Sequence, residues 1–86
     1  MTSKRGEEWR SFAPIVEEHI EEYTVKQYGD KGSDLASDYT PKKCVEEMQK
    51  YLARHFTGVR GRDETMRDTL KICHYACMLY FKETEV

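Results

Sequence analysis

The chain has 86 residues, of which 38% are hydrophobic, 35% charged and 12% aromatic. This length suits one domain with one core, and the aromatic content is too high for a disordered chain. The formal net charge of −2 argues against nucleic-acid binding, which normally needs a basic domain or a basic face. No apolar stretch is long enough to span a bilayer, and no apolar signal segment follows the basic residues near the N-terminus. We therefore expect a cytoplasmic protein that has no membrane partner.

The first predicted helix covers residues 11–28. Phe12, Val16, Ile20 and Tyr23 recur at the spacing of one helical face. Pro14 fits near the start of this helix if Ser11 is its N-cap, because the first turn needs no hydrogen bond from residue 14. Residues 1–8 are expected to be disordered. Gly29 ends the helix, and the polar composition of residues 29–40 predicts a long loop.

The second helix is predicted over residues 41–57. Thr40 is a favourable N-cap, Pro41 suits the first helical position, and Gly58 ends the helix. An apolar stripe runs along it, made of Cys44, Val45, Met48, Tyr51, Leu52, His55 and Phe56.

The third helix is predicted over residues 63–82, with Asp63 as its N-cap and residues 84–86 disordered. Ten of the twelve residues from Leu70 to Phe81 are apolar. The three cysteines are not spaced like the ligands of a structural zinc site, so we expect reduced, structural thiols. The chain is therefore expected to form a single all-α domain of three helices, residues 1–86, with the third helix at its centre.

The third helix is apolar around its whole circumference, and such a helix must be covered on all sides. The two other helices can cover little more than half of it, and the remaining patch is larger than soluble monomers usually expose. We therefore predict a homodimeric helical bundle, since two-fold pairing is the commonest closure. The predicted interface residues are Ile72, Tyr75, Ala76 and Leu79. The alternative is that Trp9 and the loop of residues 29–40 cover this face.

Glu17, Glu18 and Glu21 share one face of the first helix, and carboxylate oxygens are the ligands that Mg²⁺ prefers. The pattern Glu17-Glu18-x-x-Glu21 resembles the first half of the metal motif in MazG-type all-α nucleotide pyrophosphohydrolases. The resemblance implies that these three residues hold Mg²⁺ for the hydrolysis of nucleoside triphosphates. The second half of that motif, Glu-x-x-Asp on the following helix, is absent. The alternative is a solvated acidic face.

A basic cluster follows in the second half of the chain. Arg54, Arg60, Arg62 and Lys71 lie near a glycine-containing turn and the start of the third helix, where phosphate groups bind readily. The alternative is that Arg54 and Arg67 pair with acids of the same region, namely Asp63, Glu64 and Asp68, and with the glutamates of the first helix.

Residues 44–81 carry a second resemblance. Lys50-Tyr51-Leu52-Ala53-Arg54, a glycine-containing turn, then Asp68-Thr69-Leu70-Lys71 and Tyr75 resemble a small helical domain of phage and bacterial proteins. That family is a domain of unknown function, occasionally attached to phage nucleotide-metabolism proteins. The resemblance implies an α-helical hairpin and a connection with nucleotides.

No complete catalytic set is visible, neither a nucleophile elbow nor a glycine-rich nucleotide loop. The favoured hypothesis is therefore a non-enzymatic, cofactor-free homodimer that acts as a protein-interaction or regulatory module, on itself or on another protein. The alternative hypothesis is a Mg²⁺-dependent nucleotide-binding or pyrophosphohydrolase-like protein.

Overall fold

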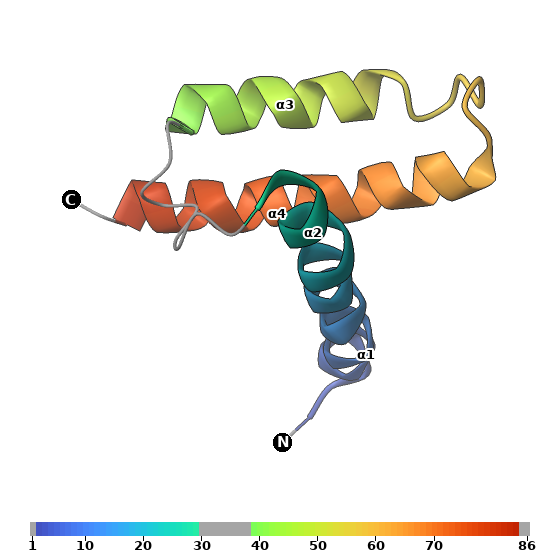
Figure 1. Cartoon of the computed structure of the whole chain (residues 1–86). Helices are drawn as coiled ribbons and strands as arrows, with labels where there is room; N and C mark the ends of the chain where they lie inside the picture. The colour runs from blue at the N-terminus through green and yellow to red at the C-terminus, as the bar shows by residue number, and fades with distance from the viewer. Residues whose placement is uncertain (1, 30–38, 85–86) are drawn as a thin grey trace. The chain divides into compact units, whose positions relative to one another are not determined.

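The computed structural model describes residues 2–29 and 39–84, and within these ranges it holds helices and turns but no strand (Figure 1). Helix α1 (Lys4–His19), the π-helical turn η1 (Ile20–Thr24) and α2 (Val25–Tyr28) follow one another without a break. Helices α3 (Pro41–Ala53) and α4 (Arg62–Thr84) complete the fold. The predicted all-α class with three helices is confirmed, if α1, η1 and α2 are counted as one.

The chain divides into two compact units, Met1–Asp30 and Lys31–Val86. Most of the predicted loop, residues 30–38, lies outside the described residues, as do residues 85 and 86 at the predicted disordered end. Thr84, in contrast, is the last residue of α4. The single-domain organisation and the central place of the third helix remain predictions.

The first helix begins at Lys4, not at Ser11 as predicted. The N-cap is Ser3, whose side-chain oxygen accepts a hydrogen bond from the backbone N–H of Gly6 at 3.0 Å. The Ser11 hydroxyl donates to the Glu7 carbonyl at 3.1 Å, as a serine inside a helix does. The sequence reading failed because it placed Pro14 in the first turn, whereas the helix tolerates it in its interior. Residues 4–8 are therefore helical.

The π-helical turn η1 interrupts this helix before its last turn. The rings of His19 and Tyr23 stack across its start, with centroids 5.2 Å apart. The helix then ends at Tyr28, and Gly29 takes the positive φ of +83° that glycine adopts most easily. Gly29 is thus the helix stop that the sequence predicts.

Helix α3 begins as predicted and ends four residues early. The Thr40 side chain accepts from the backbone N–H of Lys43 at 3.1 Å, and Pro41 occupies the first turn. The helix ends at Ala53, not at Thr57, because Arg54 leaves the helical backbone. The Thr57 N–H and hydroxyl both donate to the Arg54 carbonyl, at 3.2 and 2.8 Å, and so form a local turn.

Helix α4 begins at Arg62, so Asp63 is its second residue and not its N-cap as predicted. Gly61, with φ +88°, sets the entry to the helix. Its carbonyl accepts from the N–H and the hydroxyl of Thr65, at 3.1 and 3.0 Å. The helix continues to Thr84, two residues past the predicted end.

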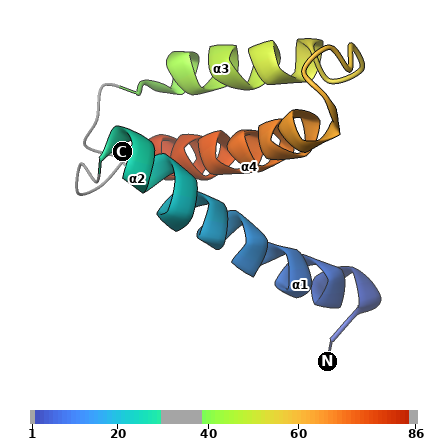
Figure 2. The same ribbon diagram turned by 45° about the vertical axis from the view of Figure 1, so that its right-hand side comes forward.

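Helices α3 and α4 form an antiparallel hairpin and run side by side in both ribbon views (Figures 1 and 2). The rings of Tyr51 and Tyr75 stack across the middle of the hairpin, with centroids 6.1 Å apart. Near its open end, the fully buried Cys44 is close to Lys82. Burial raises the pKa of the Cys44 thiol, and the lysine charge opposes this shift. The contact between the helices is therefore aromatic and polar as well as apolar.

Candidate functional site: two sides of the hairpin

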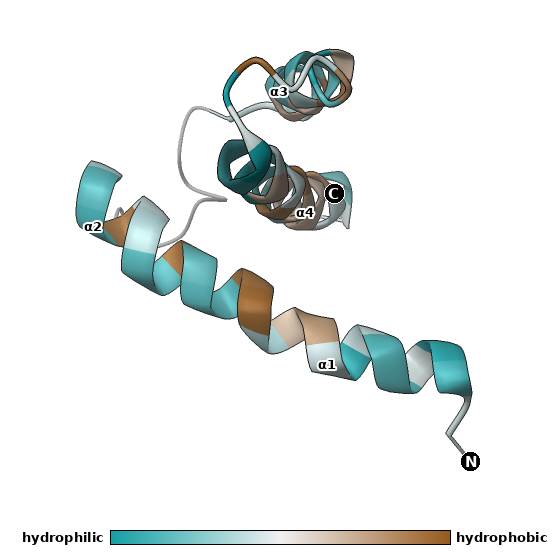
Figure 3. Ribbon diagram, turned by 90° about the vertical axis from the view of Figure 1, so that its right-hand side faces the viewer, coloured by the Kyte–Doolittle hydropathy of each residue, from teal (hydrophilic) through white to brown (hydrophobic). Residues whose placement is uncertain are grey.

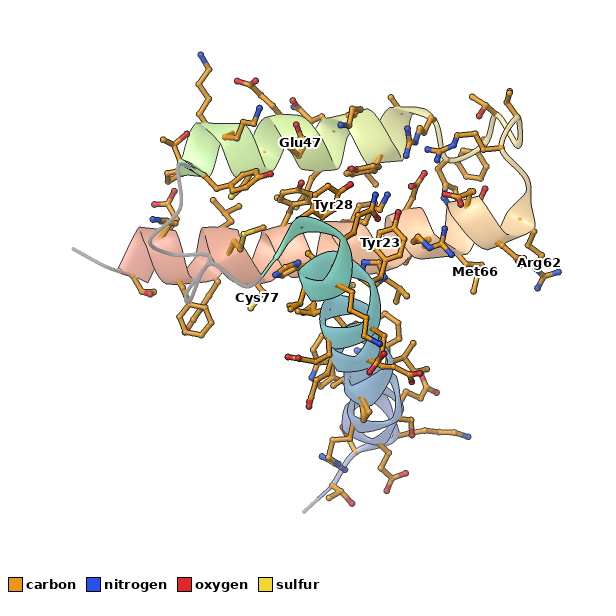
Figure 4. All side chains as sticks on the ribbon, in the orientation of Figure 1. Tyr23, Tyr28, Glu47, Arg62, Met66 and Cys77 are labelled. Atoms are coloured by element: carbon orange, nitrogen blue, oxygen red, sulfur yellow. The ribbon has the colours of Figure 1, made fainter. Side chains whose placement is uncertain are left out.

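The contacts between α3 and α4 fix which flanks of the two helices lie on the same side of the hairpin. Successive residues of a helix are about 100° apart, so each helix has one flank on either side of the plane of the hairpin. One flank of each helix is apolar and together they form the apolar side: Val45, Met48 and Leu52 of α3 with Ile72, Ala76 and Leu79 of α4. The other flanks form the basic side: Lys43, Lys50 and Arg54 of α3 with Arg67 and Lys71 of α4. Glu47, labelled in Figure 4, belongs to the basic side.

The apolar side is open to solvent along α3. Leu52 is 58% exposed and Val45 is 39% exposed, and hydrophobic segments appear in brown on both helices in Figure 3. The sequence reading placed both residues in the same stripe as the buried Cys44. Cys44 and Val45 are about 100° apart on the helix, so one neighbouring helix cannot cover both. The predicted apolar stripe of this helix was therefore too wide for one neighbouring helix, and this width indicated a second apolar surface.

The four predicted interface residues are divided between two environments. Ala76 is exposed, and Ile72 and Leu79 are half-buried on the apolar side. The ring of Tyr75 lies 5.6 Å from that of Tyr39 and also contacts Tyr51, and burial raises the pKa of its hydroxyl strongly. Tyr75 therefore packs inside the second unit, whereas the other three predicted interface residues belong to the apolar side.

On the basic side, three cations surround the ring of Tyr51. The Lys50 Nζ and Arg54 Cζ atoms lie 4.8 Å from the ring centroid, and the Lys71 Nζ lies 5.3 Å from it. Tyr51 itself is buried. Each cation is attracted by the ring quadrupole, so a single aromatic residue holds the three charges together.

Arg54, at the end of α3, forms a bidentate ion pair with α4. Its Nε and Nη2 atoms donate to two oxygens of the buried Asp68, both at 2.8 Å. This bidentate bond lowers the pKa of the Asp68 carboxyl below its ordinary value. Glu64 accepts from Arg67 at 2.5 Å and from Arg60 at 3.1 Å. Arg54 and Arg67 thus pair with Asp68 and Glu64, as the alternative expected for the acids of this region, whereas the pairing with glutamates of the first helix remains a prediction.

Lys71 differs from its basic neighbours. It is half-buried, and burial together with the charges of Arg54 and Arg60 lowers the pKa of its ammonium group, although Asp68 and Glu64 oppose the shift. Lys50, in contrast, donates to Glu47 at 2.7 Å, and this bond raises the pKa of Lys50.

The structure brings together only part of the predicted phosphate-binding set. Arg54 and Lys71 lie at the same tyrosine ring, and Arg60 is close enough to affect the pKa of Lys71. Arg62 projects from the end of α4 at the turn and points away from α3 (Figure 4). Lys50, which the predicted set omitted, belongs to the cluster.

The predicted metal-binding glutamates belong to the other unit. Glu17 and Glu18 are on α1 and Glu21 is on η1, and all three are exposed. In the same unit, Lys26 donates to Glu22 at 2.6 Å. Among the residues that the structure describes, no three His, Cys, Asp or Glu side chains are grouped as metal ligands. The thiols of Cys44, Cys73 and Cys77 are free.

Over residues 2–29 and 39–84, no helix combines the length and the hydropathy needed to cross a bilayer. Comparison of the chain with protein-family models, with curated proteins and with solved structures finds no match.

Proposed function

We propose that the protein is a homodimeric interaction module in which the apolar sides of two hairpins meet. The observation that carries this proposal is the row of apolar side chains on one side of the hairpin. Leu52, Val45 and Ala76 are exposed there, next to Ile72 and Leu79. Two hairpins joined through such rows make a four-helix bundle with two-fold symmetry.

The energetics favour this pairing. Fully burying one large apolar side chain contributes about 1.5–3 kcal/mol, so the two rows together supply many kcal/mol before the entropy cost of association. The polar basic side offers no comparable gain.

Helix α4 carries more apolar surface than the apolar side alone. By helical geometry, α4 carries Leu70, Cys73 and Cys77 on the flank turned away from α3, in addition to its part of the apolar side. One added helix covers only one of these surfaces. The proposal therefore assigns the apolar side to the partner copy.

Sedimentation velocity at micromolar concentration tests this assignment. The wild-type chain should sediment with twice its monomer mass of 10.2 kDa. Leu52→Glu places a charge in the proposed interface and should weaken the dimer at least tenfold, since burying an unpaired carboxylate costs more than 1.4 kcal/mol. A wild-type protein that sediments only at 10.2 kDa contradicts the proposal.

Met66→Glu is the matched control. Met66 has the same exposed fraction as Leu52, 58%, but lies about 120° around α4 from Ile72. This variant should remain dimeric. Equal loss of dimer in both variants would show that the apolar side is not the interface.

A further inference from the structure

We infer that the two hairpins of the proposed dimer meet antiparallel, so that α4 lies over α4 of the partner copy and the turn of one hairpin lies at the open end of the other. This inference rests on the proposed function and specifies how the second copy is oriented. Three observations carry it: the order of residues along the apolar flank of α4, the sign of the charges at its two ends, and the composition of the turn that precedes it.

Two-fold symmetry leaves two ways for the apolar sides of two hairpins to meet. If the axis runs along the helices, α4 lies over the α3 helix of the partner copy and both turns are at the same end. If the axis runs across the helices, α4 lies over the α4 helix of the partner copy, and the turns are at opposite ends. The charges on α4 distinguish these two arrangements.

The apolar flank of α4 has a charge at each end and none between them. By helical geometry, Arg62 and Glu83 lie within about 40° of Ala76 around the helix, and both are exposed. The residues of this flank that lie between the two charges are Thr65, Thr69, Ile72, Ala76 and Leu79. Such a flank, positive at its start and negative at its end, is complementary to a second copy of itself only when that copy runs antiparallel. Ile72 is then at the centre of the contact.

The same two charges lie at the ends of α4 where the dipole of the helix opposes them. A helix carries a partial positive charge at its N-terminus and a partial negative charge at its C-terminus. Arg62 is the first residue of α4 and Glu83 is the last but one, so each side chain is at the end of like sign. An antiparallel partner helix brings its negative end to Arg62 and its positive end to Glu83, and both charges are then stabilised.

The other arrangement favours only one of the two ends. With both turns at the same end, Arg62 lies beside the partner's turn, residues 54–61, which contains two arginines and no carboxylate. Glu83 then lies beside the start of α3, where Lys42 already pairs with Glu46. The antiparallel arrangement gives both ends an opposite charge, and two-fold symmetry forms each contact twice.

Dissociation constants from sedimentation equilibrium at low salt test this pairing. Arg62→Glu brings like charges together at both ends of the antiparallel dimer and should weaken it at least about threefold, as should Glu83→Arg. The double variant with both changes exchanges the two charges and should recover the wild-type dissociation constant. Asp63→Arg is the matched control, because Asp63 is in the same turn but about 100° further around α4, away from the apolar flank. It should leave the dissociation constant unchanged.

Double electron–electron resonance gives the direction independently. A spin label on Thr84→Cys, in a chain that also carries Cys73→Ser and Cys77→Ser, reports the distance between the C-terminal ends of the two α4 helices. Cys44 stays in place, since it is fully buried. The antiparallel arrangement separates the labels by about 35 Å, because a helix rises about 1.5 Å per residue. With both turns at the same end, the labels are within about 20 Å, because packed helices are about 10 Å apart.

The outcomes distinguish this orientation from the dimer itself. The long label distance, together with recovery in the double variant, supports the antiparallel pairing. A dimer with the short label distance, or a double variant that stays as weak as the single variants, overturns the orientation and leaves the proposed dimer intact. A wild-type chain that is monomeric at micromolar concentration overturns both.

Discussion

The two sides of the α3–α4 hairpin differ in whether their side chains find partners within the same hairpin. On the basic side, carboxylates from the same hairpin already contact most of the cations, as Asp68 does for Arg54. On the apolar side, Leu52 and Ala76 are exposed, and solvent cannot compensate apolar surface in this way. The basic side is thus largely complete within one chain, whereas the apolar side needs a second surface.

Removal of the Asp68 carboxylate should have the largest effect on the stability of the hairpin. In Asp68→Asn the guanidinium of Arg54 loses its carboxylate partner in a mostly buried position. We expect a loss of about 2–4 kcal/mol in the free energy of unfolding, somewhat below the loss for a fully buried pair because Arg54 is partly exposed. Urea unfolding measured by circular dichroism gives this value.

The matched control for Asp68→Asn is Glu22→Gln. It breaks the ion pair between Glu22 and Lys26, which is shorter, 2.6 Å, but exposed on both sides. Its unfolding midpoint should stay at the wild-type value, because exposed pairs contribute little. A similar loss in both variants would mean that burial does not decide the strength of these pairs.

The same carboxylate predicts a dependence of stability on pH. Arg54 lowers the folded-state pKa of Asp68 below its ordinary value of 3.8, so the unfolded chain binds the proton more readily. The stabilisation is therefore fully present above about pH 5 and is lost as the pH falls through 3.8 and then through the folded pKa. Unfolding free energies at several acidic pH values should fall less steeply for Asp68→Asn than for the wild type. Parallel curves would show that another group dominates acid unfolding.

The sequence predicts much of this architecture because its end signals are local. Thr40 and Pro41 begin α3 as expected, and Gly29 ends the first helix. The errors lie at helix ends, where the outcome depends on local hydrogen bonds and, in the first helix, on an interior proline. Thr57, for example, donates to the Arg54 carbonyl in the turn that follows α3, and no periodicity in the sequence reveals that bond.

The site was harder to predict because hydropathy does not say which flank of α4 faces α3. The apolar pattern placed Tyr75 in the predicted dimer interface. The hairpin instead pairs Tyr75 with Tyr51 and Asp68 with Arg54. These contacts join the two helices through an aromatic pair and an ion pair, which hydropathy does not single out.

Lys71→Met should change the free energy of unfolding less than Asp68→Asn does, and in the opposite direction. Burial is the main cause of the lowered pKa of Lys71, so its charged form is less stable in the folded chain than in the unfolded chain. A methionine of similar length should remove this cost and raise the free energy of unfolding by about 0.5–1 kcal/mol. Thermal unfolding without added anion measures it. A clear loss of stability would mean that Lys71 contributes more through its attraction to Asp68 than it costs by burial.

The smallest expected effect is a shift in melting temperature that distinguishes phosphate binding on the basic side from metal-dependent binding at the acidic face of the first unit. If phosphate binds at Lys71 and Arg54, triphosphate should raise the melting temperature with or without Mg²⁺, because binding to the folded state alone stabilises it. Glu18→Gln should leave this rise unchanged, since Glu18 is exposed on α1 and takes no part in the cluster. A rise that requires Mg²⁺ and disappears in Glu18→Gln would instead support the hydrolase hypothesis, in which Glu17, Glu18 and Glu21 hold the metal. The two hypotheses therefore differ in one measurable property, namely whether carboxylates of the first unit are needed for the phosphate to bind.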